Sequence, residues 1–287
     1  MIRIALPNKG RLADGARALL ERAGLAFEAR GERALQASLG GDFLALFVRA
    51  ADIPEFVADG AADVGITGLD RVVEAGCSVD RLLDLDFGRC RLAVAVREDA
   101  CSEDVASLPP GLRVATSFPR TARQFFERAG LDVELVPVSG AAEIAPHLGV
   151  ADAIVDLVST GSTLRVNGLR EIATVLESSA VLVGRCAADR DPEAAVALGD
   201  LASALESVVR ARGKRYLMAN IPRDELTAVK RILPGISGPT IVDVLDGGAH
   251  VAAHAVVDEG DVYRVIGELK AVGAEGILVT KIERLMP

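Results

Sequence analysis

Short apolar runs rich in β-branched residues alternate with segments of helical spacing along most of this 287-residue chain. Ile2 to Leu6 is one such run, and Ala13 to Ala23 after it carries aliphatic residues at helical intervals. Asp42 to Val48 and Asp63 to Gly68 repeat the strand pattern, each ahead of another helical segment. This alternation predicts an α/β protein with a mostly parallel sheet and helices on both of its faces.

Composition limits the kind of protein and its partners. Half of the residues are hydrophobic, but only 3 % are aromatic, so aliphatic side chains must fill the core. The net charge is −9 and basic residues do not cluster, which argues against nucleic acid as a partner. No apolar stretch approaches the roughly 20 residues needed to cross a bilayer. Together with the absence of a signal peptide, this predicts a cytoplasmic protein with no membrane partner.

The cysteines carry no metal-site pattern. None belongs to a C-x-x-C pair, and no paired histidine lies near one, so we expect reduced thiols rather than zinc ligands. They are Cys77, Cys90, Cys101 and Cys186.

A hydroxyl-rich turn follows one of the most apolar strands. Ala153 to Val158 has the composition of a buried strand, and the segment from Leu164 to Leu169 has the composition of a helix. The turn between them contains Ser159, Thr160, Gly161, Ser162 and Thr163. Backbone N–H groups at a helix N-terminus lack intrahelical partners and favour anions. The turn therefore predicts a phosphate-binding loop.

Two carboxylates accompany this strand. Asp152 and Asp156 lie four residues apart, so they are expected to share one face of the strand, where they suit sugar hydroxyls or Mg²⁺. The simpler alternative is an ordinary N-capped helix with Asp156 in a structural hydrogen bond. Against it, an ionised Asp in an apolar strand is costly without a partner, and the turn has more hydroxyls than one cap requires.

The spacing of residues across this region resembles the signature of the ATP phosphoribosyltransferase family, long form. The matching positions are Glu143, Gly149, Ala151, Ile154, Asp156, Leu157 and Thr160 to Leu164. Members join ATP to phosphoribosyl pyrophosphate (PRPP) in the first step of histidine biosynthesis. The T-G-x-T element alone also resembles the PRPP loop of other phosphoribosyltransferases, which have a different fold.

The resemblance implies roles for the residues of this region. The hydroxyl-rich turn and Asp156 would bind PRPP, and Asp156, Asp152 and Glu143 would act as the catalytic carboxylates. Mg²⁺ would be the cofactor, with Asp152 and Glu143 as weaker candidates for its ligands.

The opening segment Leu6 to Leu12 also resembles the family, which places Lys9 and Arg11 near the phosphates of ATP. Without the resemblance, a solvated loop would be the preferred interpretation of these two residues. Arg49 and Asp70 lie in further family-like segments and are therefore candidates for ATP binding. Taken alone, Asp70 fits a helix cap better than a catalytic group.

Two long extended segments, Leu82 to Arg97 and Glu171 to Arg185, are suited to carry the chain between two lobes. The family has such a two-lobed architecture, like that of periplasmic binding proteins, with the site between the lobes. We assign the first lobe to residues 1–90 and 171–190, and the second to residues 91–170. Within the second lobe, Ala141 to Leu148 is expected to be a helix.

The chain changes pattern after a linker helix at residues 191–212. Residues 213–287 have the order βαββαβ of a ferredoxin-like domain, with a hairpin expected at Asp246 to Gly248. The resemblance implies that histidine binds here as a feedback inhibitor and that the protein is a homo-oligomer, a dimer and a hexamer. Weak candidates for effector contacts are Ser237, Gly238 and Thr240. His250 and His254 show no metal pattern and are assigned structural roles.

Two other functions remain open on the sequence. A two-lobed binding or sensor protein without catalysis would have the same architecture, since fold does not fix function. A kinase or NTPase is disfavoured because no glycine-rich phosphate motif of those classes is present.

Overall fold

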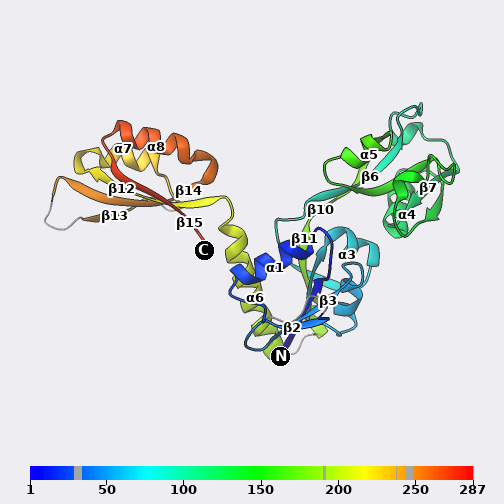
Figure 1. Cartoon of the computed structure of the whole chain (residues 1–287), viewed down its shortest axis with the longest axis horizontal. Helices are drawn as coiled ribbons and strands as arrows, with labels where there is room; N and C mark the ends of the chain where they lie inside the picture. Colours follow the sequence, from blue (N-terminus) through cyan, green and yellow to red (C-terminus); the bar gives the residue numbers. More distant parts are fainter. Residues whose placement is uncertain (29–33, 190–191, 237, 244–247, 287) are drawn as a thin grey trace. The chain divides into compact units, whose positions relative to one another are not determined.

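The structure is a computed structural model that describes residues 1–28, 34–189, 192–236, 238–243 and 248–286. The chain divides into two compact units, Met1–Ala202 and Ser203–Pro287. Figure 1 follows the chain from blue at the N-terminus to red at the C-terminus.

A six-stranded sheet forms the first lobe of the first unit. Its central strands β3, β1 and β4 are parallel, whereas β11 runs antiparallel between β4 and β5. In sheet order the strands are β2 (Gln36–Ser38), β3 (Phe43–Val48), β1 (Ile2–Pro7), β4 (Val64–Gly68), β11 (Ala180–Arg185) and β5 (Val79–Asp84). The helices of this lobe are α1 (Ala13–Arg22), α2 (Ile53–Ala58) and α3 (Leu69–Ala75).

A five-stranded sheet forms the second lobe of the same unit. β9 lies between antiparallel β6 and parallel β7, so its apolar side chains are buried on both faces. In sheet order the strands are β10 (Leu169–Ser178), β6 (Cys90–Arg97), β9 (Ala153–Val158), β7 (Leu112–Thr116) and β8 (Val133–Pro137). The helices are α4 (Pro119–Arg128) and α5 (Ser162–Val166).

Two short segments connect the lobes. The first lies in the β-rich stretch from Leu82 to Arg97, between the end of β5 at Asp84 and the start of β6 at Cys90. The second connection is Ser179, between β10 and β11. The connections bind each other, with Leu85 N donating to Ala180 O at 3.0 Å and Ala180 N donating to Phe87 O at 2.9 Å. They therefore form one hydrogen-bonded hinge.

One correction concerns the helix expected from Ala141 to Leu148. Only a 3₁₀ turn, Ala142–Ile144, forms there, followed by further turns. Ala141 has a positive φ of 52°, which is unusual for a residue other than glycine. Pro146 also lacks the N–H that an α-helix would use at that point. The segment packs against β9 as a compact turn instead.

The second unit has the expected βαββαβ order. Its antiparallel sheet has the order β13-β14-β12-β15. The elements in chain order are β12 (Lys214–Pro222), α7 (Leu226–Ile232), β13 (Thr240–Asp243), β14 (His250–Asp258), α8 (Val262–Ala271) and β15 (Glu275–Lys281). The long helix α6 (Pro192–Arg210) precedes β12, and the boundary between the two units falls within this helix. Most of the hairpin predicted at Asp246 to Gly248 lies outside the described residues.

These sheets confirm the predicted fold class of a two-lobed α/β part followed by a ferredoxin-like domain. In the part of the chain that the structure describes, no helix has both the length and the apolar character that a membrane crossing requires. All four cysteines are described, and they are free thiols.

Candidate active site

The four candidate ATP-binding residues meet at one edge of the first sheet. Lys9 and Arg11 follow β1, Arg49 follows β3, and Asp70 follows β4. These three strands are parallel neighbours, so their carboxyl ends lie side by side. The backbone N–H of Asn8 donates to Val48 O at 2.8 Å, which ties the first two turns together. Ligands typically bind at such an edge in α/β sheets.

Asp70 does not cap its helix. The N-cap of α3 is Gly68, which has no side chain, and Asp70 itself lies in the first turn and is only 1 % exposed. Its carboxylate accepts a hydrogen bond from the Ser178 hydroxyl, which in turn accepts one from the Asp70 backbone N–H at 3.0 Å. The helix-cap alternative is therefore wrong for this residue.

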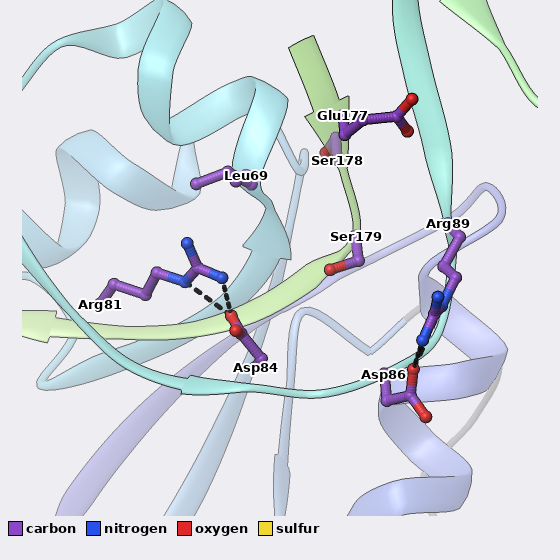
Figure 2. Close-up of a pocket in the computed structure, with 8 residues that line it drawn as sticks. All are labelled: Leu69, Arg81, Asp84, Asp86, Arg89, Glu177, Ser178 and Ser179. Carbon is purple, nitrogen blue, oxygen red and sulfur yellow. Dashed lines mark hydrogen bonds and ion pairs between the residues drawn. The ribbon is translucent and has the colours of Figure 1, made fainter.

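A cavity of about 320 Å³ lies at the hinge. Ser178 and Leu69, the neighbour of Asp70, are among its lining residues, so the cavity adjoins the carboxyl edge of the first sheet. Figure 2 shows two ion pairs in its wall, Arg81–Asp84 and Arg89–Asp86, on either side of Ser179 in that view. The other residue in its wall is Glu177. Sequence reasoning missed this cavity because its residues come from three separate parts of the chain, at Leu69, between Arg81 and Arg89, and at Glu177 to Ser179.

A second cavity, of about 130 Å³, lies beside the predicted phosphate loop. It is lined by Glu143, Asp156, Leu157, Val158, Ser159, Thr160, Gly161, Thr163 and Leu164. Gly161 has a φ of 75° and precedes α5, so a side chain there would be strained. The Thr160 and Ser162 hydroxyls lie 2.9 Å apart, but Ser162 does not line the cavity. The loop and two predicted carboxylates thus come together.

Strand alternation explains why Glu143 and Asp156 meet. Asp156 is on the same face of β9 as Ile154 and Val158, and the 3₁₀ turn that carries Glu143 packs on that face. The pKa of Asp156 is raised, first by burial and then by the charge of Glu143. The Leu157 N–H, which donates to Asp156 Oδ1 at 2.8 Å, and the charge of Arg71 act in the opposite direction.

Asp152 lies apart from this cavity. It comes just before β9, whereas the phosphate loop follows the carboxyl end of that strand. Four residues of strand span about 13 Å, so a shared face does not bring Asp152 and Asp156 together. The Asp152 carboxylate instead pairs with Arg113 at 3.0 Å, which lowers its pKa. The structure therefore separates Asp152 from the other two predicted carboxylates.

One contact between the lobes has no signal in the sequence. Helix α4 begins after Phe118, whose side chain has no acceptor to cap it. The Glu74 carboxylate of α3 takes this role and accepts from the N–H groups of Arg120 and Thr121, both at 2.9 Å. It also accepts from the Thr121 hydroxyl at 2.7 Å. A helix of one lobe is thus capped by a residue of the other.

The predicted effector residues lie around the start of β13. The Gly238 N–H donates to Pro234 O at 2.9 Å, and Thr240 pairs with His254 in the sheet. Ser237 lies outside the described residues. The Nδ1 atom of His254 is 2.8 Å from the Tyr216 hydroxyl. Among the described residues, no group of three or more His, Cys, Asp and Glu side chains is arranged to hold a metal ion.

Comparisons with known proteins agree with this architecture. Residues 49–207 match the family model for ATP phosphoribosyltransferase, and residues 211–284 match the model for the HisG C-terminal domain. The chain is 60 % identical to the ATP phosphoribosyltransferase of Gemmatimonas aurantiaca, with 100 % of both chains covered. It is 50 % identical to that of Halorubrum lacusprofundi, with 99 % of this chain and 100 % of the relative covered.

A solved structure is also similar to this chain. The ATP phosphoribosyl transferase (HisG:HisZ) complex from Thermotoga maritima matches with a TM-score of 0.62 at 27 % identity, covering 72 % of this chain and 99 % of that one. These matches extend over the whole chain and include both the phosphate loop and the C-terminal domain. The chain therefore belongs to the ATP phosphoribosyltransferase family, the transferases of histidine biosynthesis.

Proposed function

We propose that this enzyme transfers the phosphoribosyl group of PRPP to N1 of ATP and releases pyrophosphate. The observation that carries the proposal is the cavity where the hydroxyl-rich loop meets Glu143 and Asp156. Hydroxyl and backbone N–H donors suit the 5′-phosphate, and the carboxylates suit the ribose hydroxyls. One site thus presents groups for both ends of a ribose phosphate.

The reaction forms a bond between adenine N1 and ribose C1 and breaks the bond between C1 and the pyrophosphate oxygen. The electron pair of the broken bond leaves with pyrophosphate. Adenine N1 carries no proton, so the attack requires no general base. The loop fixes the phosphate end, while the negative charges of Asp156 and Glu143 stabilise positive charge that develops on the ribose.

Mg²⁺ fits this site as a cofactor. Glu143 lines the cavity and offers the carboxylate oxygen that Mg²⁺ prefers, and substrate phosphates would complete the coordination. When bound, Mg²⁺ neutralises charge on the leaving pyrophosphate. Glu143 and Asp156 are its candidate ligands here, whereas Asp152 is held by Arg113 away from the cavity.

Charge suggests how ATP lies at the first lobe. In the wall of the hinge cavity Arg81 and Arg89 are already paired with Asp84 and Asp86, and Glu177 adds a further negative charge. The described residues of this wall therefore offer phosphates no free cation and suit an uncharged adenosine better. The turn that contains Lys9 and Arg11 is basic and suits the triphosphate. Arg11 is tied to the hinge through a hydrogen bond from its Nη1 to Gly88 O, so the two regions adjoin.

The assay that tests this function mixes the purified enzyme with ATP, PRPP and Mg²⁺. Pyrophosphate release that requires all three, together with a product that carries ribose on adenine N1, is the expected result. Binding of either substrate without turnover would instead favour a binding protein and refute the proposal.

Arg11→Ala is expected to raise the KM for ATP at least about tenfold, because a charge-assisted contact to phosphate is lost. The KM for PRPP should change much less, since the phosphate loop belongs to the other lobe. Steady-state kinetics with each substrate varied in turn measures both values. Arg97→Ala is the matched control, since Arg97 pairs with Asp99 at the opposite end of β6 from the hinge. Equal effects on both substrates would contradict the assignment.

We propose further that histidine inhibits the enzyme by binding the second unit and that subunits associate into a homo-oligomer. The second unit has its own core, with Leu217, Ile221, Val251 and Leu269 fully buried, so it is suited to act as a separate sensor. Its edge strands β13 and β15 offer unpaired backbone groups through which subunits can associate.

A further inference from the structure

The Asp70 carboxylate is hidden from solvent, but its two cationic neighbours are not. Its side chain is 2 % exposed, whereas those of Arg11 and Arg71 are 32 % and 27 % exposed. Arg11 Nη2 lies 3.5 Å from Asp70 Oδ1, and Arg71 Nε lies 3.7 Å from Asp70 Oδ2. The buried Asp70 carboxylate therefore contacts two guanidinium groups that are partly exposed and accessible to a ligand.

The carboxylate is itself held from the hinge. Ser178 is 5 % exposed, donates its hydroxyl hydrogen to Asp70 Oδ1, and accepts the Asp70 backbone N–H. Ser178 ends β10 and adjoins Ser179, one connection between the lobes, and Gly88, the acceptor for Arg11, lies in the other. A side chain at Gly88 would collide with Leu12, because its Cβ would lie 2.3 Å from Leu12 Cδ2. The network thus fixes Arg11 against both hinge segments.

The two arginines have different surroundings, Arg11 in the first lobe and Arg71 in contact with the second. Arg11 belongs to the turn after β1. Arg71 reaches the second lobe, where its guanidinium carbon lies 4.2 Å from the ring centroid of Phe118. Phe118 follows β7, the parallel neighbour of β9, so it lies at the edge of the sheet that carries the phosphate loop.

We infer that Asp70 and Ser178 are positioning residues, which align Arg11 for the phosphates of ATP and Arg71 for the diphosphate of PRPP. This inference rests on the proposed function. It assigns Asp70 a positioning role, in which its carboxylate contacts the two arginines, instead of the ATP contact predicted from the sequence. A carboxylate shared between two guanidinium groups restrains both side chains before substrate arrives. Preorganisation of this kind lowers the entropic cost of binding at each site.

The central test is a double-mutant cycle on the KM for ATP. Asp70→Asn and Arg11→Ala are each expected to raise it about tenfold or more. Because Asp70 acts through Arg11, adding Asp70→Asn to Arg11→Ala should raise it less than about threefold further. A second cycle combines Asp70→Asn with Arg71→Met and is measured on the KM for PRPP; it tests the Arg71 arm of the inference, that is, the alignment of Arg71. Fully multiplicative effects in a cycle would overturn the inference for the arginine that the cycle contains.

Ser178→Ala provides a milder perturbation if Asp70→Asn impairs folding. Because Ser178 holds the carboxylate that aligns Arg11, loss of its hydroxyl should raise the KM for ATP roughly tenfold. The melting temperature should fall at least as far as in the control, since a buried charged acceptor also loses a donor. The control is Ser207→Ala, which removes another buried hydroxyl, one that donates to Ala204 O at 2.7 Å. Equal KM values for the two serine variants would refute the positioning role.

Failure of the proposed function has a different signature. Arg11→Ala with a wild-type KM for ATP would refute the ATP site and, with it, the Arg11 arm of the inference. The cycle between Asp70 and Arg71 on the KM for PRPP would still decide the other arm.

Discussion

Asp156→Asn is expected to lower kcat by about 10²–10³, the typical cost of removing one preorganised transition-state contact, while it stabilises the folded protein at neutral pH. The first effect follows from the place of Asp156 beside the phosphate loop. The second follows because burial raises the pKa of this carboxyl, so its ionised form destabilises the fold. Asparagine keeps the shape and an acceptor for the Leu157 N–H but carries no charge.

The sign of the pH dependence follows from linkage. The folded-state pKa lies above the unfolded value of about 3.9, so the stability contributed by protonated Asp156 is lost as pH rises through the folded pKa. The melting temperature of Asp156→Asn should therefore exceed that of the wild type at pH 7 to 8. The difference should disappear as pH falls to about 4. Thermal unfolding across this range, together with steady-state kinetics, measures both effects.

Asp152→Asn is the matched comparison, four residues earlier in the chain. Arg113 lowers the pKa of Asp152, so loss of this charge should destabilise the protein at neutral pH, the opposite sign to Asp156. Its kcat should stay close to that of the wild type. A loss of activity in Asp152→Asn as large as that in Asp156→Asn would show that Asp152 belongs to the active site. Wild-type kinetics in both Asp156→Asn and Thr163→Ala would refute the phosphate-loop assignment.

Removal of the residues after Arg212 is expected to abolish inhibition by histidine completely. Inhibition requires histidine to bind one global state better than another, with a coupling of roughly 1–3 kcal/mol. If the sensor is the second unit, nothing remains in the shortened chain to provide that coupling. The rate of pyrophosphate release is measured with and without millimolar histidine in both chains, after thermal unfolding has shown that the shortened chain is folded.

Hydrogen exchange in the full-length enzyme gives an independent result. Histidine should slow amide exchange in the second unit, at Gly238 and in β13. Protection confined to Met1–Ala202 would place the sensor elsewhere, as would a folded, active shortened chain that is still inhibited equally. A full-length enzyme insensitive to millimolar histidine would refute regulation but leave the catalytic proposal standing.

Local pattern was enough to predict the features that depend on neighbouring residues. Strand and helix alternation gave the α/β class, and the turn from Ser159 to Thr163 pointed to the cavity that the structure places there. The βαββαβ order was likewise readable from apolar periodicity. Each of these signals is contained within a few tens of residues.

Features that join distant residues were beyond such reasoning. Ser178 is one of two adjacent serines at the end of an extended segment, and its partner Asp70 lies 108 residues away. Glu74 similarly caps a helix 46 residues further along the chain. The separation of Asp152 from the cavity was not predictable for another reason: the strand period specifies the face of a side chain but not its distance along the strand. The helix expected at Ala141 does not form because Pro146 lacks a helical N–H and Ala141 has a positive φ, and apolar spacing alone does not report either feature.

The insertion of β11 into the first sheet sets the order in which a growing chain completes its lobes. β5 lies at the edge of that sheet with β11 as its neighbour, so it has no partner until residue 185 has been synthesised. Every strand of the second sheet, through Ser178 of β10, precedes β11 in the chain and therefore emerges from the ribosome before it. Domains generally fold as their residues emerge. The lobe encoded in the interior of the chain is thus completed first, and the lobe that contains the N-terminus is completed after it.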